Sequence, residues 1–210
     1  MRIGIIGAGN VGSTLGSRWA KLGHEVIYGV RSGREKALGE LLAQSGPTAR
    51  AACVAEAARA SEVVLLATRW EATEQAIIDC ESLAGKMVID PTLPLFPDFS
   101  GLSAGASTSG GEIVAGWAAG ARVVKAFNHM GANIMADPVF AGRPAPAFYC
   151  GDDAAAKTAV GSLISGLGFD AIDVGPLSMA RHTEPLGFLW VTLALKLGYG
   201  REIAFDLLRR

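Results

Sequence analysis

Three glycines near the start of the chain have the spacing of a phosphate-binding turn. The segment Gly7-Ala8-Gly9-Asn10-Val11-Gly12 ends a short apolar run and opens a stretch with helical periodicity. In such a turn, Gly7 allows a tight bend, Gly9 lets the backbone approach a pyrophosphate, and Gly12 lets the helix pack against the strand. Free N–H groups at the start of the helix then bind the anion. The motif therefore predicts a dinucleotide-binding site.

Residues after the second expected strand distinguish between the two nicotinamide dinucleotides. An NAD site places a carboxylate there to bind the ribose 2′-hydroxyl. This chain has Arg31, Ser32 and Arg34 instead, with no acidic residue before Glu35. Two guanidinium groups can pair with a 2′-phosphate, and the serine hydroxyl can donate a hydrogen bond to it. The pattern favours NADP(H) over the alternative that these are ordinary surface arginines.

The elements that position these residues alternate between apolar strands and amphipathic helices. This alternation predicts an α/β fold, a Rossmann doubly wound parallel sheet. A Gly- and Ser-rich stretch from Ser100 to Gly111 is expected to be a loop, and Asp152 with Asp153 to cap the helix that follows. The expected strands cover 2–6, 24–28, 62–67, 86–89, 122–127, 147–150 and 170–174, and the helices 10–22, 34–44, 70–82, 154–166 and 177–197.

Composition narrows the class of protein further. Half of the 210 residues are hydrophobic and the formal net charge is −1, which favours neither nucleic acid nor an anionic membrane as partner. Cys53, Cys80 and Cys150 form neither a disulfide framework nor a metal-ligand cluster. No apolar run reaches the ~18 residues of a membrane helix, and a strand from Arg2 leaves no room for a signal peptide. We therefore expect a cytoplasmic protein that binds small molecules.

Further segments along the chain carry a family resemblance. They include Gly23-His24-Glu25, Thr68-Arg69-Trp70-Glu71, Val88–Leu95, Val124–Asn128, Cys150–Asp153, Asp173–Ser178 and Ala180-Arg181 with Glu184-Pro185-Leu186. With them, the chain resembles the NADPH-dependent reductases of coenzyme F420, a deazaflavin. It is also similar to the oxidoreductase domain of ferric-reductase membrane proteins.

The resemblance implies a domain organisation and a set of binding residues. A Rossmann domain over residues 1–120 would precede a small C-terminal α/β extension over 121–210, which binds the acceptor and forms a homodimer. The deazaflavin would lie in the cleft between them. Asn10 and Val11 would contact phosphates, Arg31 would bind the 2′-phosphate, Thr68 and Arg69 would lie beside the dinucleotide, and Asn128, Met130, Gly131 and Ala132 would flank the nicotinamide.

The chain departs from the family pattern at four positions. The family commonly has Ser at Val30, Pro at Arg69, His at Asn128 and Pro at Gly131. The last two differences lie on the acceptor side, so they leave the NADP(H) assignment intact and the acceptor open. Coenzyme F420, a flavin, a quinone and a ferric chelate are all compatible with the same fold. Arg122, Arg143 and Arg181 are candidates for binding a polyanionic acceptor tail.

A general acid–base pair is not evident in the sequence. Hydride transfer between two stacked rings needs the reacting carbons held roughly 3 to 3.5 Å apart, and positioning by Asn128, His129 and Gly131 would suffice. His129 is either an acceptor contact or an ordinary loop histidine. A non-catalytic NADPH-binding redox sensor remains an alternative, as does a reductase of imines or carbonyls, which would need a proton donor near Asn128.

Other polar residues receive structural interpretations. Lys125 with Asn128 resembles the pair of the hydroxyacid dehydrogenases, but those enzymes carry a larger C-terminal domain, so we expect Lys125 to close a strand. His182 and Glu184 are too close in sequence to act as an i, i+4 metal pair, and no third ligand lies near them. The sequence therefore predicts no metal site.

Overall fold

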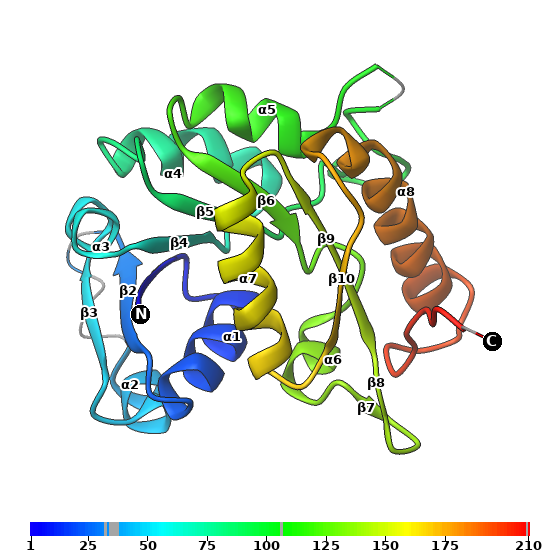
Figure 1. Cartoon of the computed structure of the whole chain (residues 1–210), viewed down its shortest axis with the longest axis horizontal. Coiled ribbons are helices and arrows are strands. Elements are labelled where there is room, and N and C mark those ends of the chain that lie inside the picture. The colour runs from blue at the N-terminus through cyan, green and yellow to red at the C-terminus, as the bar shows by residue number, and fades with distance from the viewer. Residues whose placement is uncertain (32, 34–37, 106, 209) are drawn as a thin grey trace.

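A single eight-stranded sheet organises the chain in the computed structural model, which describes residues 1–31, 33, 38–105, 107–208 and 210 (Figure 1). The strand order is β10-β9-β6-β5-β4-β1-β2-β3. Neighbouring strands pair in parallel except β6 and β9, which are antiparallel. The strands are β1 (Arg2–Ile6), β2 (Glu25–Val30), β3 (Ala49–Cys53), β4 (Val63–Leu66), β5 (Met87–Asp90), β6 (Arg122–Ala126), β9 (Pro146–Gly151) and β10 (Asp170–Asp173). The expected Rossmann-type α/β fold is confirmed.

Helices cover both faces of the sheet. They are α1 (Asn10–Lys21), α2 (Gly39–Ser45), α3 (Val54–Ala60), α4 (Thr73–Asp79), α5 (Gly110–Trp117), α6 (Ala132–Ala136), α7 (Ala154–Gly166) and α8 (Ala180–Val191). A 3-10 turn at Trp70–Ala72 precedes α4, another at Leu177–Met179 precedes α8, and a π turn at Thr192–Lys196 follows α8. A short hairpin of β7 (Val139–Phe140) and β8 (Arg143–Pro144) lies beside the main sheet.

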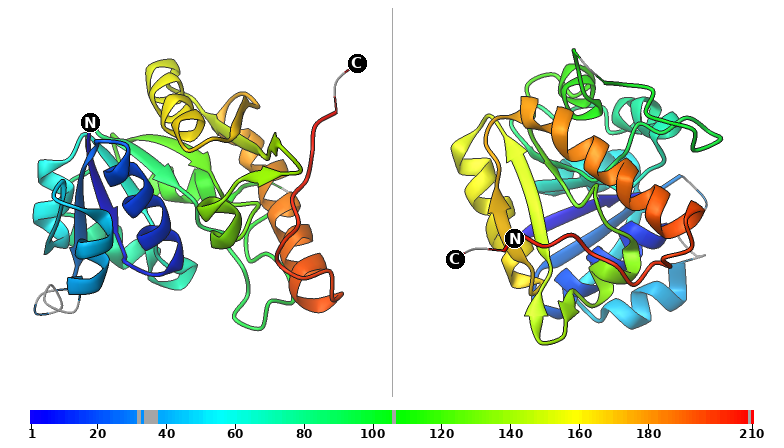
Figure 2. Two further views of the ribbon diagram at one scale, coloured as in Figure 1. Left: turned by 90° about the horizontal axis from the view of Figure 1, so that it is seen from below. Right: turned by 90° about the vertical axis from the view of Figure 1, so that its right-hand side faces the viewer.

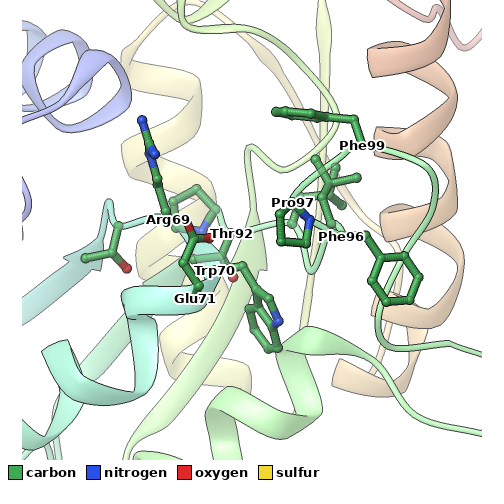
Figure 3. Close-up of a pocket in the computed structure, with 11 residues that line it drawn as sticks. Arg69, Trp70, Glu71, Thr92, Phe96, Pro97 and Phe99 are labelled. Atoms are coloured by element: carbon green, nitrogen blue, oxygen red, sulfur yellow. The ribbon is translucent and has the colours of Figure 1, made fainter.

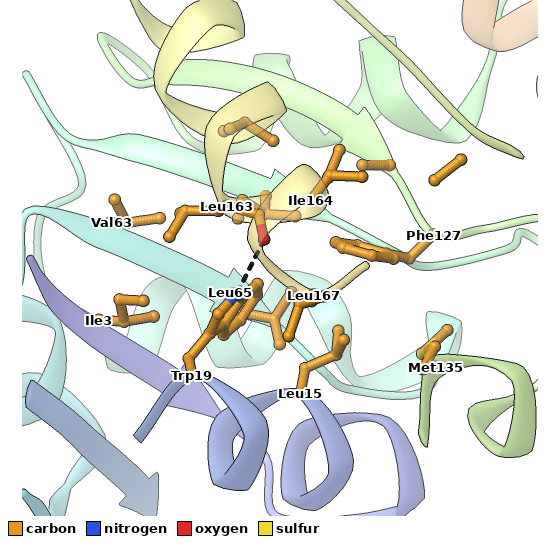
Figure 4. Close-up of a cluster of buried hydrophobic side chains, with 14 of the residues drawn as sticks. Ile3, Leu15, Trp19, Val63, Leu65, Phe127, Met135, Leu163, Ile164 and Leu167 are labelled. Atoms are coloured by element: carbon orange, nitrogen blue, oxygen red, sulfur yellow. Dashed lines mark hydrogen bonds between the residues drawn. The ribbon is translucent and has the colours of Figure 1, made fainter. Parts of the chain in front are cut away.

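The core has two halves, one on each face of the sheet. Trp19 of α1 packs edge-on against Phe127, and its indole N–H donates to the carbonyl of Leu163 in α7 at 3.3 Å (Figure 4). Ile3 and Ile5 of β1 join this half, whereas Ile6 joins the half beneath α3, α4 and α5. Burial of both faces explains why the central strands are continuous apolar runs.

The expected elements are found with shifts at their ends, and several others were not expected. The helix expected over 34–44 is described from Gly39, because 34–37 lie outside the described residues. The 177–197 segment is a succession of 3-10, α and π turns that contains Pro185. β3, α3, α5, α6 and the β7–β8 hairpin were not predicted.

The two aspartates expected to cap a helix do different things. Asp153 caps α7 by accepting from the N–H of Ala156 at 2.7 Å, as expected. Asp152 instead accepts from the N–H of Leu177 at 2.8 Å, so the prediction that it also caps α7 is wrong. Its carboxylate thereby connects the end of β9 to the 3-10 turn that precedes α8.

The C-terminal part of the chain continues the sheet. The boundary expected after residue 120 lies just before β6, which pairs with β5 in register from Met87–Arg122 to Asp90–Lys125. α8 and the C-terminal segment lie at the end of the molecule away from β1, β2 and β3 (Figure 2). Among the described helices, none combines the length and the apolar character that crossing a membrane requires.

Candidate functional site

The turn after β1 has the geometry that its glycines predict. Gly7 has φ +99°, and a Cβ there would lie 2.6 Å from the carbonyl oxygen of Ala67. A Cβ at Gly12 would overlap the carbonyl oxygen of Gly7. A Cβ at Gly9 would meet no heavy atom within 4 Å. The protein itself therefore requires glycine at 7 and 12, whereas the space above Gly9 is open to a ligand.

The start of α1 suits an anion. Gly9 is its N-cap residue and supplies no side-chain hydrogen bond, and the first turn contains no acidic residue. The first N–H groups of a helix have no intrahelical partner, and the helix dipole places partial positive charge there. With the open space at Gly9, this end of the 12-residue helix can accept a pyrophosphate.

A cavity of about 340 Å³ extends from this turn across the carboxyl ends of β1, β4 and β5. It brings together five of the predicted binding residues, Gly9, Asn10, Val11, Thr68 and Arg69. The full lining consists of Gly9, Asn10, Val11, Ala67, Thr68, Arg69 and Pro91. A crevice at the carboxyl ends of parallel strands is where open α/β sheets bind ligands.

A second cavity of about 460 Å³ shares Thr68, Arg69 and Pro91 with the first. We call the segment 91–109 that forms much of its wall the cavity loop; the structure describes all of it except residue 106. Figure 3 shows Arg69 and Trp70 on one side and Phe96 with Phe99 of the loop on the other. The sequence did not predict this cavity, although the run Leu93-Pro94-Leu95 within the resemblance was a signal.

The residues predicted to select NADP(H) lie partly outside the described residues. Arg31 directly follows β2 and is exposed. β2 pairs with β1 up to Ile6–Gly29, and the N–H of Gly7 donates to the carbonyl of Gly29 at 3.2 Å. Arg31 therefore lies at the same edge of the sheet as the glycine turn. Ser32 and Arg34 are outside the part of the chain that the structure describes.

The residues predicted to flank a nicotinamide lie deeper than those of the glycine turn. Asn128 and Met130 are buried, and the Asn128 side-chain amide donates to the carbonyl of Thr183 at 2.9 Å. Its Oδ1 has no hydrogen-bond partner among the described residues. Gly131 is the N-cap residue of α6, directly before Ala132. None of these four residues lines either of the two cavities.

His129 lies in the turn between β6 and α6, as the loop interpretation expects, but its side chain is buried in the core. Its side chain is 3% exposed and stacks beside Phe148, with ring centroids 5.1 Å apart. The N–H of Phe148 donates to its Nε2 at 3.4 Å. Desolvation lowers the pKa of His129 to about 4. The imidazole is therefore neutral at neutral pH and lines neither cavity.

The three arginines considered for an acceptor tail each have a carboxylate beside them. Arg181 holds Glu112 through two hydrogen bonds of 2.8 and 2.6 Å, Arg143 lies 3.0 Å from Asp206, and Arg122 lies 4.0 Å from Asp153. Arg69 differs, because it lines both cavities and no ion pair within the described residues involves it. Arg69 is thus the cation placed to meet a bound anion.

A buried ion cluster lies below the larger cavity. Asp90, Lys125 and Glu184 are each at most 1% exposed, with the ammonium 3.0 Å from the first carboxylate and 2.8 Å from the second. Burial by itself lowers the pKa of Lys125, but the two carboxylates outweigh it and raise the pKa above its usual value. Lys125 lies within β6 near its end, and the sequence assigned no role to Glu184.

Comparisons with known proteins show which family and fold this chain resembles. The family model described as "NADP oxidoreductase coenzyme F420-dependent" matches residues 2–94. A "putative F420 dependent NADP-reductase" from Arthrobacter sp. FB24 is 34% identical over the full length of both chains, with a TM-score of 0.89. The hypothetical protein SMa0349 from Sinorhizobium meliloti is 26% identical, with 100% of this chain and 96% of that chain covered and a TM-score of 0.76.

A curated relative of this chain is a metalloreductase. Metalloreductase STEAP3 of Rattus norvegicus is 29% identical over 187 residues, which cover 88% of this chain. The match spans 36% of the length of that protein, so the similarity concerns only part of it.

Proposed function

This chain belongs to the family of coenzyme F420-dependent NADP oxidoreductases, and on that premise we propose that it transfers a hydride between NADPH and coenzyme F420. The observation that carries the proposal is the continuity of the two cavities through Thr68, Arg69 and Pro91. One cavity extends from the glycine turn and suits a dinucleotide. The other has an aromatic wall and suits a second ring system.

The dinucleotide site is formed by residues of α1 and the strand ends. The amides at Asn10 and Val11 bind the pyrophosphate, and Arg31 binds the 2′-phosphate together with Ser32 and Arg34. Thr68 and Arg69 lie along the dinucleotide. When bound, the nicotinamide supplies or accepts the hydride. The family resemblance assigns Asn128, Met130, Gly131 and Ala132 to the ring; because they line neither cavity and the unpaired Oδ1 of Asn128 is buried, this role requires that the segment open when the nicotinamide binds.

The larger cavity is the acceptor site in this proposal. Trp70, Leu93 and Phe96 provide apolar surface for a planar ring, and Arg69 offers a positive charge to an anionic substituent. Transfer between two rings depends on their distance and orientation, which the surrounding side chains set. His129, neutral and buried, contributes packing against Phe148 of β9.

A reductase of flavins or ferric chelates is the second candidate. The similarity to the rat metalloreductase favours it, because it covers most of this chain. The same two cavities would then hold NADPH and a flavin or an anionic chelate. Arg69, where the F420 reductases commonly have Pro, suits an anionic acceptor of either kind.

A parallel spectrophotometric assay tests the proposal. NADPH is mixed with the protein and oxidised coenzyme F420, FMN or ferric citrate in separate reactions, with NADH as the control donor. Turnover with coenzyme F420 that requires NADPH supports the proposal. Turnover with FMN or ferric citrate alone supports the second candidate. Saturable NADPH binding without turnover of any acceptor contradicts both and indicates a redox sensor.

A further inference from the structure

Both ends of the cavity loop are attached to one buried ammonium group. At the start of the loop, Nζ of Lys125 donates to the carbonyl of Thr92 at 2.6 Å and to Oδ2 of Asp90 at 3.0 Å. Oδ1 of Asp90 accepts from the N–H and the hydroxyl of Thr92 at 2.9 and 2.6 Å. Thr92 itself lines the larger cavity. The loop therefore leaves β5 on a fixed path.

The far end of the loop is held through Glu184 of α8. Its two carboxylate oxygens accept from the N–H groups of Gly110 and Gly111, each at 2.9 Å, and Oε1 also lies 2.8 Å from Lys125. These amides open α5, where the loop ends, and would otherwise have no intrahelical partner. A Cβ at Gly110 would approach Glu184 to 3.0 Å and Pro94 to 3.1 Å, so the fit is close.

The same helical segment also holds the tip of the loop. Lys196 of the π turn after α8 donates from Nζ to the carbonyl of Phe99 at 2.6 Å. Phe99 has φ +58° and lines the larger cavity, as does Phe96. The α8 segment thus contacts the loop directly at its end and tip, and at its start through Lys125.

A cluster of this kind is not needed for stability alone. Desolvating three charged groups costs free energy that their mutual attraction only offsets, and a buried ion pair is often replaced by apolar residues without loss. The cluster instead fixes the position of the cavity loop, because its hydrogen bonds reach Thr92 at the start of the loop and Gly110 and Gly111 directly after it. Fixing that wall fixes the shape of the cavity.

We propose that Lys125 and Glu184 are positioning residues that hold the cavity loop and thereby set the affinity of the larger cavity for the electron acceptor. The role rests on the proposed function, because it assigns the acceptor to that cavity. Neither residue touches the acceptor. Their effect is larger for the acceptor than for the dinucleotide, because every described cavity-loop residue that lines a cavity lines the larger one, and only Pro91 also lines the smaller.

The test compares two variants with one control. The double variant Lys125→Met/Glu184→Gln removes the Lys125–Glu184 ion pair and leaves Asp90 with the two hydrogen bonds from Thr92 as its remaining partners. The exposed Lys196→Met removes the hydrogen bond to Phe99 and a cation–π contact of 6.0 Å with Phe188, and does not threaten folding. Lys157→Met is the control, because it removes an ion pair of 3.0 Å with Asp173 at α7 and β10, outside the cavity loop. Thermal unfolding establishes that each variant is folded.

Three quantities are then measured: the dissociation constants of oxidised coenzyme F420 and NADPH, and the rate of chymotrypsin cleavage after Phe99, because Pro97 blocks cleavage after Phe96. We expect about tenfold weaker acceptor binding, a much smaller change in NADPH binding and faster cleavage in the double variant. Lys196→Met should change the same quantities in the same directions by less, and Lys157→Met should change none. Folded variants with wild-type acceptor affinity overturn the proposal, even if cleavage is faster.

These binding measurements do not depend on turnover. Acceptor binding that weakens in the double variant, in a protein that turns over no acceptor, supports the positioning role and contradicts the proposed function. Turnover with an unchanged acceptor dissociation constant in both variants supports the proposed function and contradicts the positioning role.

Discussion

Gly12 and Gly7 face each other so closely that a Cβ on Gly12 would overlap the carbonyl oxygen of Gly7. Gly9, between them in sequence, has open space where its Cβ would be. Alanine at the two positions should therefore have opposite effects. Gly12→Ala should destabilise the fold by about 1–3 kcal/mol, because helix and turn must separate. Gly9→Ala should leave stability unchanged and weaken NADPH binding, because the added methyl group occupies ligand space.

Thermal unfolding and NADPH fluorescence titration separate these effects. Gly116→Ala is the matched control, because a Cβ there also meets nothing within 4 Å but Gly116 lies in α5. Gly116→Ala should neither lower the thermal stability nor weaken NADPH binding. If Gly9→Ala binds NADPH as tightly as the wild type, the pyrophosphate does not lie against Gly9.

Arg31 should determine the preference for NADPH over NADH. It is exposed after β2, so Arg31→Ala should not alter folding. Loss of one charge-assisted contact to the 2′-phosphate should weaken NADPH binding by about tenfold to a hundredfold. NADH lacks that phosphate, so its dissociation constant should not change. Arg50→Ala, which removes an exposed pair with Glu56 on β3 and α3, is the control. If Arg31→Ala weakens NADPH and NADH binding equally, Arg31 contacts a part of the dinucleotide other than the 2′-phosphate.

The glycine turn was predictable because its requirements are local. The φ of Gly7 and the contact between Gly7 and Gly12 arise within six residues of chain. β3 and α3 were missed because the Ala-rich segment 49–60 has neither strand alternation nor an apolar helical stripe. Small residues serve there for close packing, since a Cβ at Gly4 or Gly29 would come within 2.9 Å of Ala57. Glycines inside two strands were the available signal.

The cavity loop was not predictable for a different reason. Its path depends on Lys125 and Glu184, which contact residues 33 to 74 positions away in sequence. Neither contact produces a periodic pattern in the sequence. The sequence pattern around Glu184 suggested no role other than that of a metal ligand. The burial of His129 likewise depends on Phe148 and Pro146 of β9, which pairs with β6 antiparallel.

His129 should make the stability of the protein depend on pH in the acidic range. Burial depresses its pKa from 6.5 to about 4, so the unfolded chain binds the proton more readily. The stabilisation is fully present above pH 6.5 and is lost as the pH falls from 6.5 to about 4, by up to about 3 kcal/mol. His129→Phe, which can stack on Phe148, removes this dependence. Urea unfolding of both proteins at pH 4.5 and 7 measures the difference.

His182→Phe is the control for that experiment, since it removes a histidine of α8 that lies outside this core region. Its stability should fall with pH as in the wild type. A His129→Phe variant whose free energy of unfolding falls just as steeply between pH 7 and 4.5 would show that the buried imidazole does not carry the effect.

The homodimer implied by the family resemblance should form through exposed apolar residues at the end of α8 and in the segment that follows it. Leu189, Leu195, Leu197 and Tyr199 are 46%, 48%, 62% and 68% exposed, and an apolar patch of this kind is typical of an interface. A two-fold axis would bury the patch against its own copy.

Leu195→Glu should therefore convert a dimer into a monomer in sedimentation velocity, because it brings two carboxylates together across the axis. Val139→Glu, which changes a side chain that is 53% exposed on β7, should leave the dimer intact. A dimer that survives Leu195→Glu, or a wild-type protein that sediments as a monomer, contradicts this interface.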